Sequence, residues 1–89
     1  MKKIIIAEDF PSQRKIYRKV IEHYKKDFQI DEVENGSELV KKVKENNYDI
    51  IFTDQNMPGG INGLSAVKRI REFNKKVQIY LISDDEIYE

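Results

Sequence analysis

Three carboxylates stand where apolar runs of the chain end. Glu8 and Asp9 follow the run at 4–7, and Asp54 follows the run at 50–53. Short apolar runs that are closed by a polar residue and followed by a helical pattern are typical of buried strands in a parallel sheet. Ligands bind such sheets outside the carboxyl ends of the strands. We therefore expect the three carboxylates at one edge of the molecule, close enough to share a hard divalent cation.

Magnesium is the cation that this set of oxygen ligands favours, because proteins hold it with one or two carboxylates, a phosphate oxygen and waters. Asp9 and Asp54 are the predicted carboxylate ligands, Glu8 acts directly or through a water, and the backbone carbonyl of Asn56 completes the shell. An aspartate beside such a metal can also attack a phosphoryl group, and Asp54 is the candidate. Ser83, which ends a later apolar run, is predicted to donate a hydrogen bond to a phosphoryl oxygen.

Each of these residues also has a purely structural interpretation, since a single Asp or Ser after a strand is usually a helix cap or a turn residue. Only their agreement at one sheet edge favours a site. An EF-hand starting at Asp54 is excluded because its twelfth position is Ser65 rather than Glu. The glycine-rich stretch 59–63 lacks the lysine of a phosphate-binding P-loop. His23, the only histidine, lies in a predicted helix among lysines, which disfavours a zinc site or a Ser-His relay.

Length and composition limit the function classes. The 89 residues form at most one small domain, and 39% hydrophobic residues suffice for a core. Sixteen basic residues balance sixteen acidic ones, so no global field favours nucleic acid or a membrane as a partner. The absence of cysteine excludes disulfides and suits the cytoplasm, which is the predicted location. No apolar run approaches the ~18 residues that span a bilayer.

Strand and helix patterns alternate along the chain. Strands are predicted at 3–7, 28–34, 49–53 and 77–82, and helices at 11–24, between Asn35 and Asn46, and at 64–73. The strand at 49–53 is the most apolar and so is predicted to be central, whereas 28–34 mixes in acids as an edge strand does. This βαβαβαβ order predicts an α/β fold with helices on both faces of a doubly wound parallel sheet. The first helix is expected to bury one wide face made of Ile16, Tyr17, Val20, Ile21 and Tyr24.

Three motifs carry a family resemblance, which covers essentially the whole chain. They are Glu8-Asp9-x-Pro11-x-x-Arg14, Glu34-Asn35-Gly36-x-Glu38-Leu39, and Tyr48-Asp49-Ile50-Ile51-Phe52-Thr53-Asp54-x-x-Met57-Pro58. With them, the chain resembles the receiver domain of two-component response regulators. The resemblance implies a flavodoxin-like fold, dependence on Mg²⁺, and transfer of a phosphoryl group to Asp54 from a sensor histidine kinase or a phosphotransfer protein. Ser83 stands where the family has its Ser or Thr switch residue. The chain would be a phosphoacceptor rather than a turnover enzyme.

The chain also departs from the family pattern. Receivers have five strands in the order 2-1-3-4-5, whereas residues 1–89 end just after the fourth predicted strand. The fifth strand, its lysine and its aromatic switch residue would be missing, and Lys75 and Lys76 enter the fourth strand at the opposite end. Asp84 adds negative charge beside Ser83, and the loop before Gly63 is one residue longer than usual. Phosphotransfer is therefore expected to be slow.

Two rival functions remain. A truncated receiver could keep the fold and act as a non-switching dimerisation or interaction module. An enzyme of the haloacid-dehalogenase type also uses a strand-end Asp nucleophile, but it usually has an acid two residues later, where this chain has Asn56.

Assembly follows from the expected truncation. The fourth strand would become an edge with unpaired N–H and C=O groups, which is a template for another chain. We predict a two-fold homodimer in which the fourth strands pair antiparallel into an eight-stranded sheet. A missing last helix would also leave Ile16, Val20 or Tyr24 of the first helix without cover.

Overall fold

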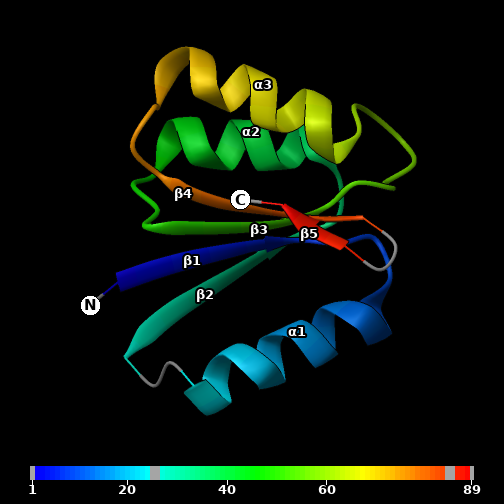
Figure 1. Cartoon of the computed structure of the whole chain (residues 1–89), viewed down its shortest axis with the longest axis vertical. Helices are drawn as coiled ribbons and strands as arrows, with labels where there is room; N and C mark the ends of the chain where they lie inside the picture. Colours follow the sequence, from blue (N-terminus) through cyan, green and yellow to red (C-terminus); the bar gives the residue numbers. More distant parts are fainter. Residues whose placement is uncertain (1, 25–26, 84–85, 89) are drawn as a thin grey trace.

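A single sheet between two layers of helix makes up the part of the chain that the computed structural model describes, residues 2–24, 27–83 and 86–88 (Figure 1). The elements are β1 (Lys2–Ala7), α1 (Pro11–Tyr24), β2 (Phe28–Val33), α2 (Gly36–Glu45), β3 (Ile50–Asp54), α3 (Gly63–Phe73), β4 (Gln78–Ser83) and β5 (Glu86–Tyr88). The strand order is β2-β1-β3-β4-β5, and the first four strands in the chain are parallel. The predicted doubly wound βαβαβαβ fold is confirmed, with β3 central and β2 at an edge.

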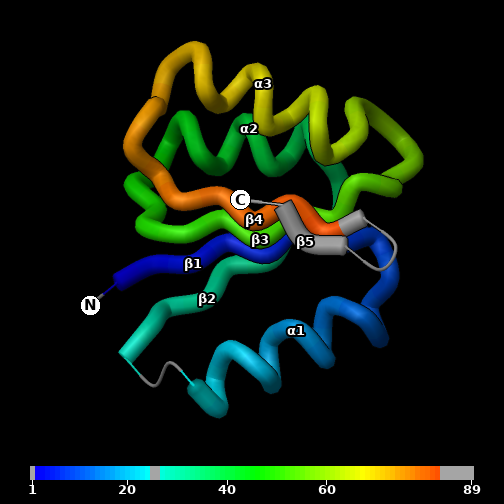
Figure 2. Tube along the Cα trace, in the orientation of Figure 1, coloured from blue at the N-terminus to red at the C-terminus, as the bar shows by residue number. Residues whose placement is uncertain are grey.

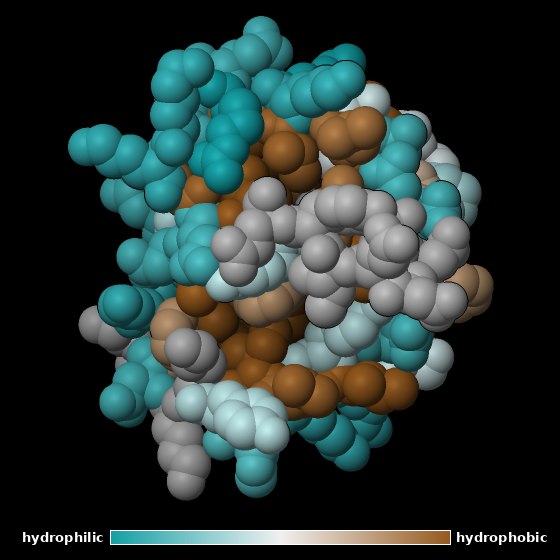
Figure 3. Space-filling view, in the orientation of Figure 1, coloured by the Kyte–Doolittle hydropathy of each residue, from teal (hydrophilic) through white to brown (hydrophobic). Residues whose placement is uncertain are grey.

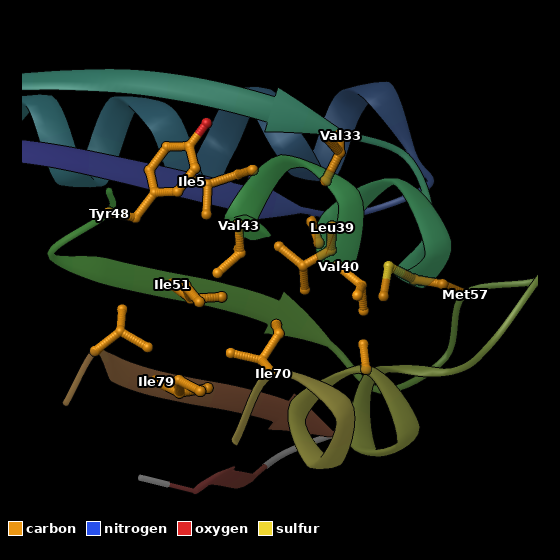
Figure 4. Packing of buried hydrophobic residues seen from close by; sticks show 13 residues of the cluster. Ile5, Val33, Leu39, Val40, Val43, Tyr48, Ile51, Met57, Ile70 and Ile79 are labelled. Atoms are coloured by element: carbon orange, nitrogen blue, oxygen red, sulfur yellow. The ribbon is translucent and has the colours of Figure 1, made fainter. Parts of the chain in front are cut away.

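The two faces of the sheet are covered unequally. The helices α2 and α3 lie together on one face, and α1 lies alone on the other, as the Cα trace shows (Figure 2). The larger core lies under α2 and α3, where side chains from β1, β3 and β4 meet those of both helices (Figure 4). Ile5, Leu39, Ile51 and Ile70 are completely buried there. The core under α1 is smaller and has only Ile4, Ile6 and Ile21 as its buried members among the described residues.

The wide buried face predicted for α1 is wrong in part. Ile21 is buried, but Ile16 and Val20 are each 52% exposed and Tyr24 is 76% exposed. The physical reason is that α1 packs on β1 and β2. Its arginines hold it there: Arg14 Nε lies 3.1 Å and Arg18 Nη1 2.6 Å from the Glu32 carboxylate of β2. Among the described residues, the one helix on this face lies over β1 and β2 and leaves the β3–β4 part without a covering helix.

Asparagine side chains begin both helices of the other face. Asn35 Oδ1 accepts a hydrogen bond of 2.8 Å from the Glu38 amide at the start of α2 and so caps this helix. Asn62 Oδ1 accepts one of 2.9 Å from the Ser65 amide in α3. Within the described ranges, no helix combines the length and the apolar character that crossing a membrane requires.

The short strand β5 was not predicted, and it corrects the expectation of a bare β4 edge. Leu81, Ile82 and Ser83 of β4 pair antiparallel with residues 88, 87 and 86. This pairing satisfies backbone groups that would otherwise face solvent. The edge is therefore covered along the carboxyl-terminal half of β4. A continuous eight-stranded sheet through two β4 strands stays a prediction, and it would require β5 to leave this position.

Candidate functional site

Parallel pairing of two neighbouring strands brings the three predicted carboxylates together. In the register of β1 and β3, Ala7 pairs with Thr53, so the residues that follow leave the sheet side by side. One carboxylate oxygen from each of Glu8, Asp9 and Asp54 lies within 4.8 Å of the others. The expectation that these residues share one sheet edge is therefore borne out by the geometry.

Glu8 is the most enclosed member of this acidic cluster, with 2% of its surface exposed. Its Oε1 accepts a hydrogen bond of 3.2 Å from the Phe10 amide. Arg14 donates to the backbone oxygen of Glu8 at 2.8 Å, and its cation therefore braces the turn rather than the carboxylate. Burial is the main cause that raises the pKa of Glu8 to about 7, and the neighbouring carboxyl groups of Asp54 and Asp9 add to it. The ionised form of Glu8 is therefore less favourable in the folded chain than in water.

The donor set fits a hard divalent cation. Asp9 Oδ1 is buried and, among the described residues, has no hydrogen-bond partner. A buried oxygen without a partner is costly, and three crowded carboxylates repel one another. An oxygen-binding cation such as Mg²⁺ would relieve both costs. The residues present therefore match the magnesium that the sequence analysis predicted.

An open pocket of about 330 Å³ lies against the cluster. Three of the predicted site residues, Glu8, Asp54 and Asn56, line this pocket, whereas Asp9 is not among its lining residues. Asn56 is exposed. The sequence analysis missed four further members of the lining: Phe10, just before α1, Gln13 and Tyr17 of α1, and Ile82 of β4. The sequence held a signal for the residues of α1: this helix begins two residues after Asp9, so its first turns must pass the ends of β1 and β3. Burial, followed by the charges of Glu8 and Asp54, raises the pKa of Tyr17.

Ser83 reaches the same edge through its backbone. In the register of β3 and β4, Asp54 pairs with Ile82, and Ser83 is the last residue of β4. Its side chain lies outside the part of the chain that the structure describes, as does Asp84. The predicted hydrogen bond from the Ser83 hydroxyl to a phosphoryl oxygen thus stays a prediction. Lys75 and Lys76 precede β4, at the opposite end of the strand, as expected.

The loop after Asp54 is fastened at both ends by one residue that the sequence analysis did not single out. The Gln55 amide donates to Ile82 O at 2.9 Å, and Gln55 O accepts from the Gly63 amide at 3.1 Å. The Gln55 side chain also accepts from the Leu64 amide at 2.7 Å, at the start of α3. These bonds fix the path of residue 56, the predicted carbonyl ligand.

The comparison with protein families agrees with this geometry. The family described as the response regulator receiver domain matches residues 4–88. The chain belongs to this receiver family. Among curated relatives, it is 39% identical over 70 residues to the transcriptional regulatory protein ResD of Bacillus subtilis, covering 79% of this chain and 28% of ResD. It is 32% identical over 81 residues to the chemotaxis protein CheY of Halobacterium salinarum, covering 90% of this chain and 64% of that protein. The receiver chain thus spans well under a third of ResD.

Solved structures confirm the receiver fold. The response regulator TrrA of Thermotoga maritima, in a crystal structure described as a complex with Mg²⁺-BeF, superposes with a TM-score of 0.84 at 35% identity, over 93% of this chain and 70% of that one. The structure of the histidine kinase ThkA in complex with TrrA contains a match over 100% of this receiver and 74% of that chain, with a TM-score of 0.84 at 34% identity. The flavodoxin-like fold named in the sequence analysis is therefore shown.

The raised pKa of Glu8 predicts a pH-dependent stability in the absence of divalent cations. Since the folded pKa of about 7 lies above the ordinary 4.5, the wild-type chain should lose stability as pH rises between these values. Glu8→Gln can still accept from the Phe10 amide but cannot ionise. We expect it to exceed wild type by about 2–3 kcal/mol above about pH 8 and to match it below about pH 4, by urea unfolding. Glu45→Gln at the exposed end of α2 is the control, and an equal gain there would contradict the assignment.

A second prediction concerns the close approach of Gly63 to the strand that carries Asp54. A Cβ at Gly63 would lie 2.2 Å from Asp54 O, which is backbone and cannot move aside cheaply. Gly63→Ala should cost about 1–3 kcal/mol in urea unfolding. At Gly60 the added Cβ would come close only to the Ser37 hydroxyl, at 2.9 Å, which can rotate aside, so Gly60→Ala should cost much less. Equal costs for the two variants would show that the Gly63 contact does not hold the loop.

Proposed function

We propose that this receiver domain accepts a phosphoryl group on Asp54 from the phosphohistidine of a sensor kinase or a phosphotransfer protein. Asp9 and Asp54, with the backbone carbonyl of Asn56, would hold Mg²⁺, and Glu8 would act directly or through a water. The observation that carries the proposal is the cluster of three carboxylates beside an open pocket, with one buried oxygen of Asp9 lacking a partner. The kinase complex and the Mg²⁺-BeF complex of TrrA support it as properties of a similar protein.

The group transfer balances without any further reactant. A carboxylate oxygen of Asp54 forms a bond to phosphorus while the bond from phosphorus to the donor's imidazole nitrogen breaks, and that nitrogen keeps the electron pair. Bound Mg²⁺ would reduce the repulsion between the anionic carboxylate and the anionic phosphoryl group. Asp54 ends as an acyl phosphate, so the chain is consumed as an acceptor in each transfer. This is the behaviour of a signalling domain rather than of a turnover enzyme.

The other residues of the pocket position the reacting carboxylate. Arg14 braces the turn at Glu8 through the backbone oxygen, and Gln55 fastens the loop that carries residue 56. Ser83 would donate its hydroxyl to a phosphoryl oxygen from the neighbouring strand end. None of the residues that line the pocket is basic, so the charge added by the phosphoryl group would be only partly balanced. For this reason we expect slow and short-lived phosphorylation.

The rival role as a non-switching interaction module is favoured by one observation, the exposed apolar flank of α1. The two roles differ in whether Asp54 is modified. A dehalogenase-type hydrolase gains no support, because position 56 is an exposed asparagine rather than an acid.

Phosphorylation is tested with acetyl phosphate and Mg²⁺, followed by intact-protein mass spectrometry over time. We expect a single phosphoryl addition to the wild-type chain that forms slowly and decays quickly, and no addition to Asp54→Asn. Asp49→Asn, at the opposite end of β3, is a matched control that should be labelled like wild type. Labelling that persists in Asp54→Asn would refute the role of Asp54. Complete absence of labelling would favour the interaction module.

Metal binding is tested separately, by titrating Mg²⁺ while recording backbone amide signals by NMR. Signals near Glu8, Asp9 and Asn56 should shift at millimolar Mg²⁺, and Asp54→Ala should abolish the response because it removes a hard oxygen ligand. Signals at the far end of the sheet, such as Tyr48, serve as the internal control. An unchanged titration in Asp54→Ala would overturn the proposed ligand set.

A further inference from the structure

Two Asn-Gly bonds, Asn35-Gly36 and Asn62-Gly63, stand at the starts of α2 and α3. Both lie at the same end of the helical layer (Figure 1), away from the hydrophilic side chains that gather where these helices end (Figure 3). Every other asparagine of the chain is followed by a larger residue. Glycine has no side chain to shield its backbone nitrogen or to restrict its rotation. An Asn-Gly bond is therefore the place where a chain most readily loses a side-chain amide without an enzyme.

The reaction is an intramolecular displacement. The deprotonated backbone nitrogen of the glycine forms a bond to Cγ of the asparagine. The bond from Cγ to the side-chain nitrogen breaks, and this nitrogen keeps the electron pair and leaves as ammonia after protonation. The resulting succinimide ring takes up one water, which opens it at either carbonyl to give aspartate or isoaspartate. Water is the only co-reactant, and each product carries one more negative charge than asparagine.

The fold restrains the two Asn-Gly bonds in nearly the same way. Asn35 and Asn62 have extended ψ angles of 169° and 176°, and the side-chain oxygen of each accepts a capping hydrogen bond. Both glycines are buried, and a Cβ added to Gly36 or Gly63 would lie 2.3 or 2.2 Å from a neighbouring backbone oxygen. The succinimide ring closes only when ψ of the asparagine leaves its extended value. The cap must therefore open transiently before either site can react.

The two sites differ in the hydrogen bonding of the attacking nitrogen. The Gly63 amide donates to Gln55 O at 3.1 Å, and the next amide of α3 donates to the Gln55 side chain at 2.7 Å. Among the described residues, the Gly36 amide donates no hydrogen bond. Turning ψ of Asn62 would thus break the bond to Gln55, whereas turning ψ of Asn35 breaks no bond of the attacking nitrogen.

Exposure of the side chains would rank the two sites in the opposite order, since Asn62 is exposed and Asn35 is half-buried. We propose that Asn35 is a site of spontaneous deamidation in the folded chain, and that the hydrogen bond from Gly63 to Gln55 protects Asn62. In the unfolded chain this bond is lost, and both asparagines should react at comparable rates.

Deamidation at Asn35 would act on the loop that follows Asp54. In the fold, Gly36 packs closely against the backbone oxygen of Ile61 in this loop. Aspartate at position 35 could still accept the hydrogen bond from the Glu38 amide. Isoaspartate instead lengthens the main chain by one carbon just before Gly36, so this close contact could not be kept. The isoaspartyl form should therefore be less stable, whether or not Asp54 is phosphorylated.

The proposal is tested by incubating the 89-residue chain in mildly alkaline buffer, either folded or in concentrated urea, and mapping its peptides by mass spectrometry after an acid quench. In the folded chain, conversion at Asn35 should exceed that at Asn62 at least about fivefold, as the retention of one backbone hydrogen bond implies. In urea the two rates should be comparable. Asn35→Ser keeps a capping side chain but lacks the reacting amide, so it should leave conversion at Asn62 unchanged.

Protection of Asn62 is tested with Gln55→Ala, which removes the side-chain acceptor at the start of α3. Conversion at Asn62 should rise in this variant while that at Asn35 stays the same, and far-ultraviolet circular dichroism checks that it folds. An unchanged rate at Asn62 would overturn the role of this contact. Conversion in the folded wild type that is absent at Asn35, or at least as fast at Asn62, would overturn the proposal. So would a ratio of the two rates that urea leaves unchanged.

The effect on the loop is measured on the isoaspartyl form after chromatographic separation. Its urea midpoint should be lower than that of Asn35→Asp, which has the same charge but a main chain of normal length. Equal midpoints would contradict the predicted loss of the contact between Gly36 and Ile61.

Discussion

The crowding of carboxylates at the ends of β1 and β3 is the constraint around which the rest of the structure is arranged. Because these strands are parallel neighbours, Glu8, Asp9 and Asp54 leave the sheet at one point, within 4.8 Å of one another. Repulsion and desolvation would favour opening this edge. The turn is instead braced at its backbone by Arg14. A bound cation would offset the repulsion between the carboxylates and the cost of burying them. The same crowding would therefore account both for a less stable site without metal and for the proposed binding of Mg²⁺.

The helices on the two faces of the sheet differ in number, and both layers contact the edge that carries the carboxylates. The helices α2 and α3 share a thick core with the sheet, and through Gln55 the start of α3 holds the loop that follows Asp54. On the opposite face, α1 packs over β1 and β2 through Ile21 and Tyr17, and ion pairs from Arg14 and Arg18 to Glu32 accompany this contact. The β3–β4 surface that remains open runs into the acidic pocket. The apolar hollow beside α1 and the acidic pocket therefore lie on one side of the molecule and share Tyr17 and Ile82.

Much of this could be predicted from the sequence, because the signals are local. Apolar runs and the alternation of strand and helix patterns located every element up to β4, and the rule that parallel strands end together located the carboxylates. Three features could not be predicted, each for its own reason. The helix period alone placed Ile16, Val20 and Tyr24 on a buried face, and it did not show that α1 packs over β1 and β2, which leaves them exposed. The strand β5 is too short to show a hydrophobic period. The hydrogen bond that the Leu64 amide donates to the Gln55 side chain has no sequence signature.

The central claim is that the carboxylates form one electrostatically strained unit that a divalent cation relaxes. The most direct measurement is the titration of the Glu8 side-chain carboxyl carbon by NMR, with and without Mg²⁺. The account predicts an apparent pKa of about 7 without the metal and a clearly lower one at saturating Mg²⁺. A Glu8 carboxyl that titrates near its ordinary value of 4.5 in both conditions would contradict it.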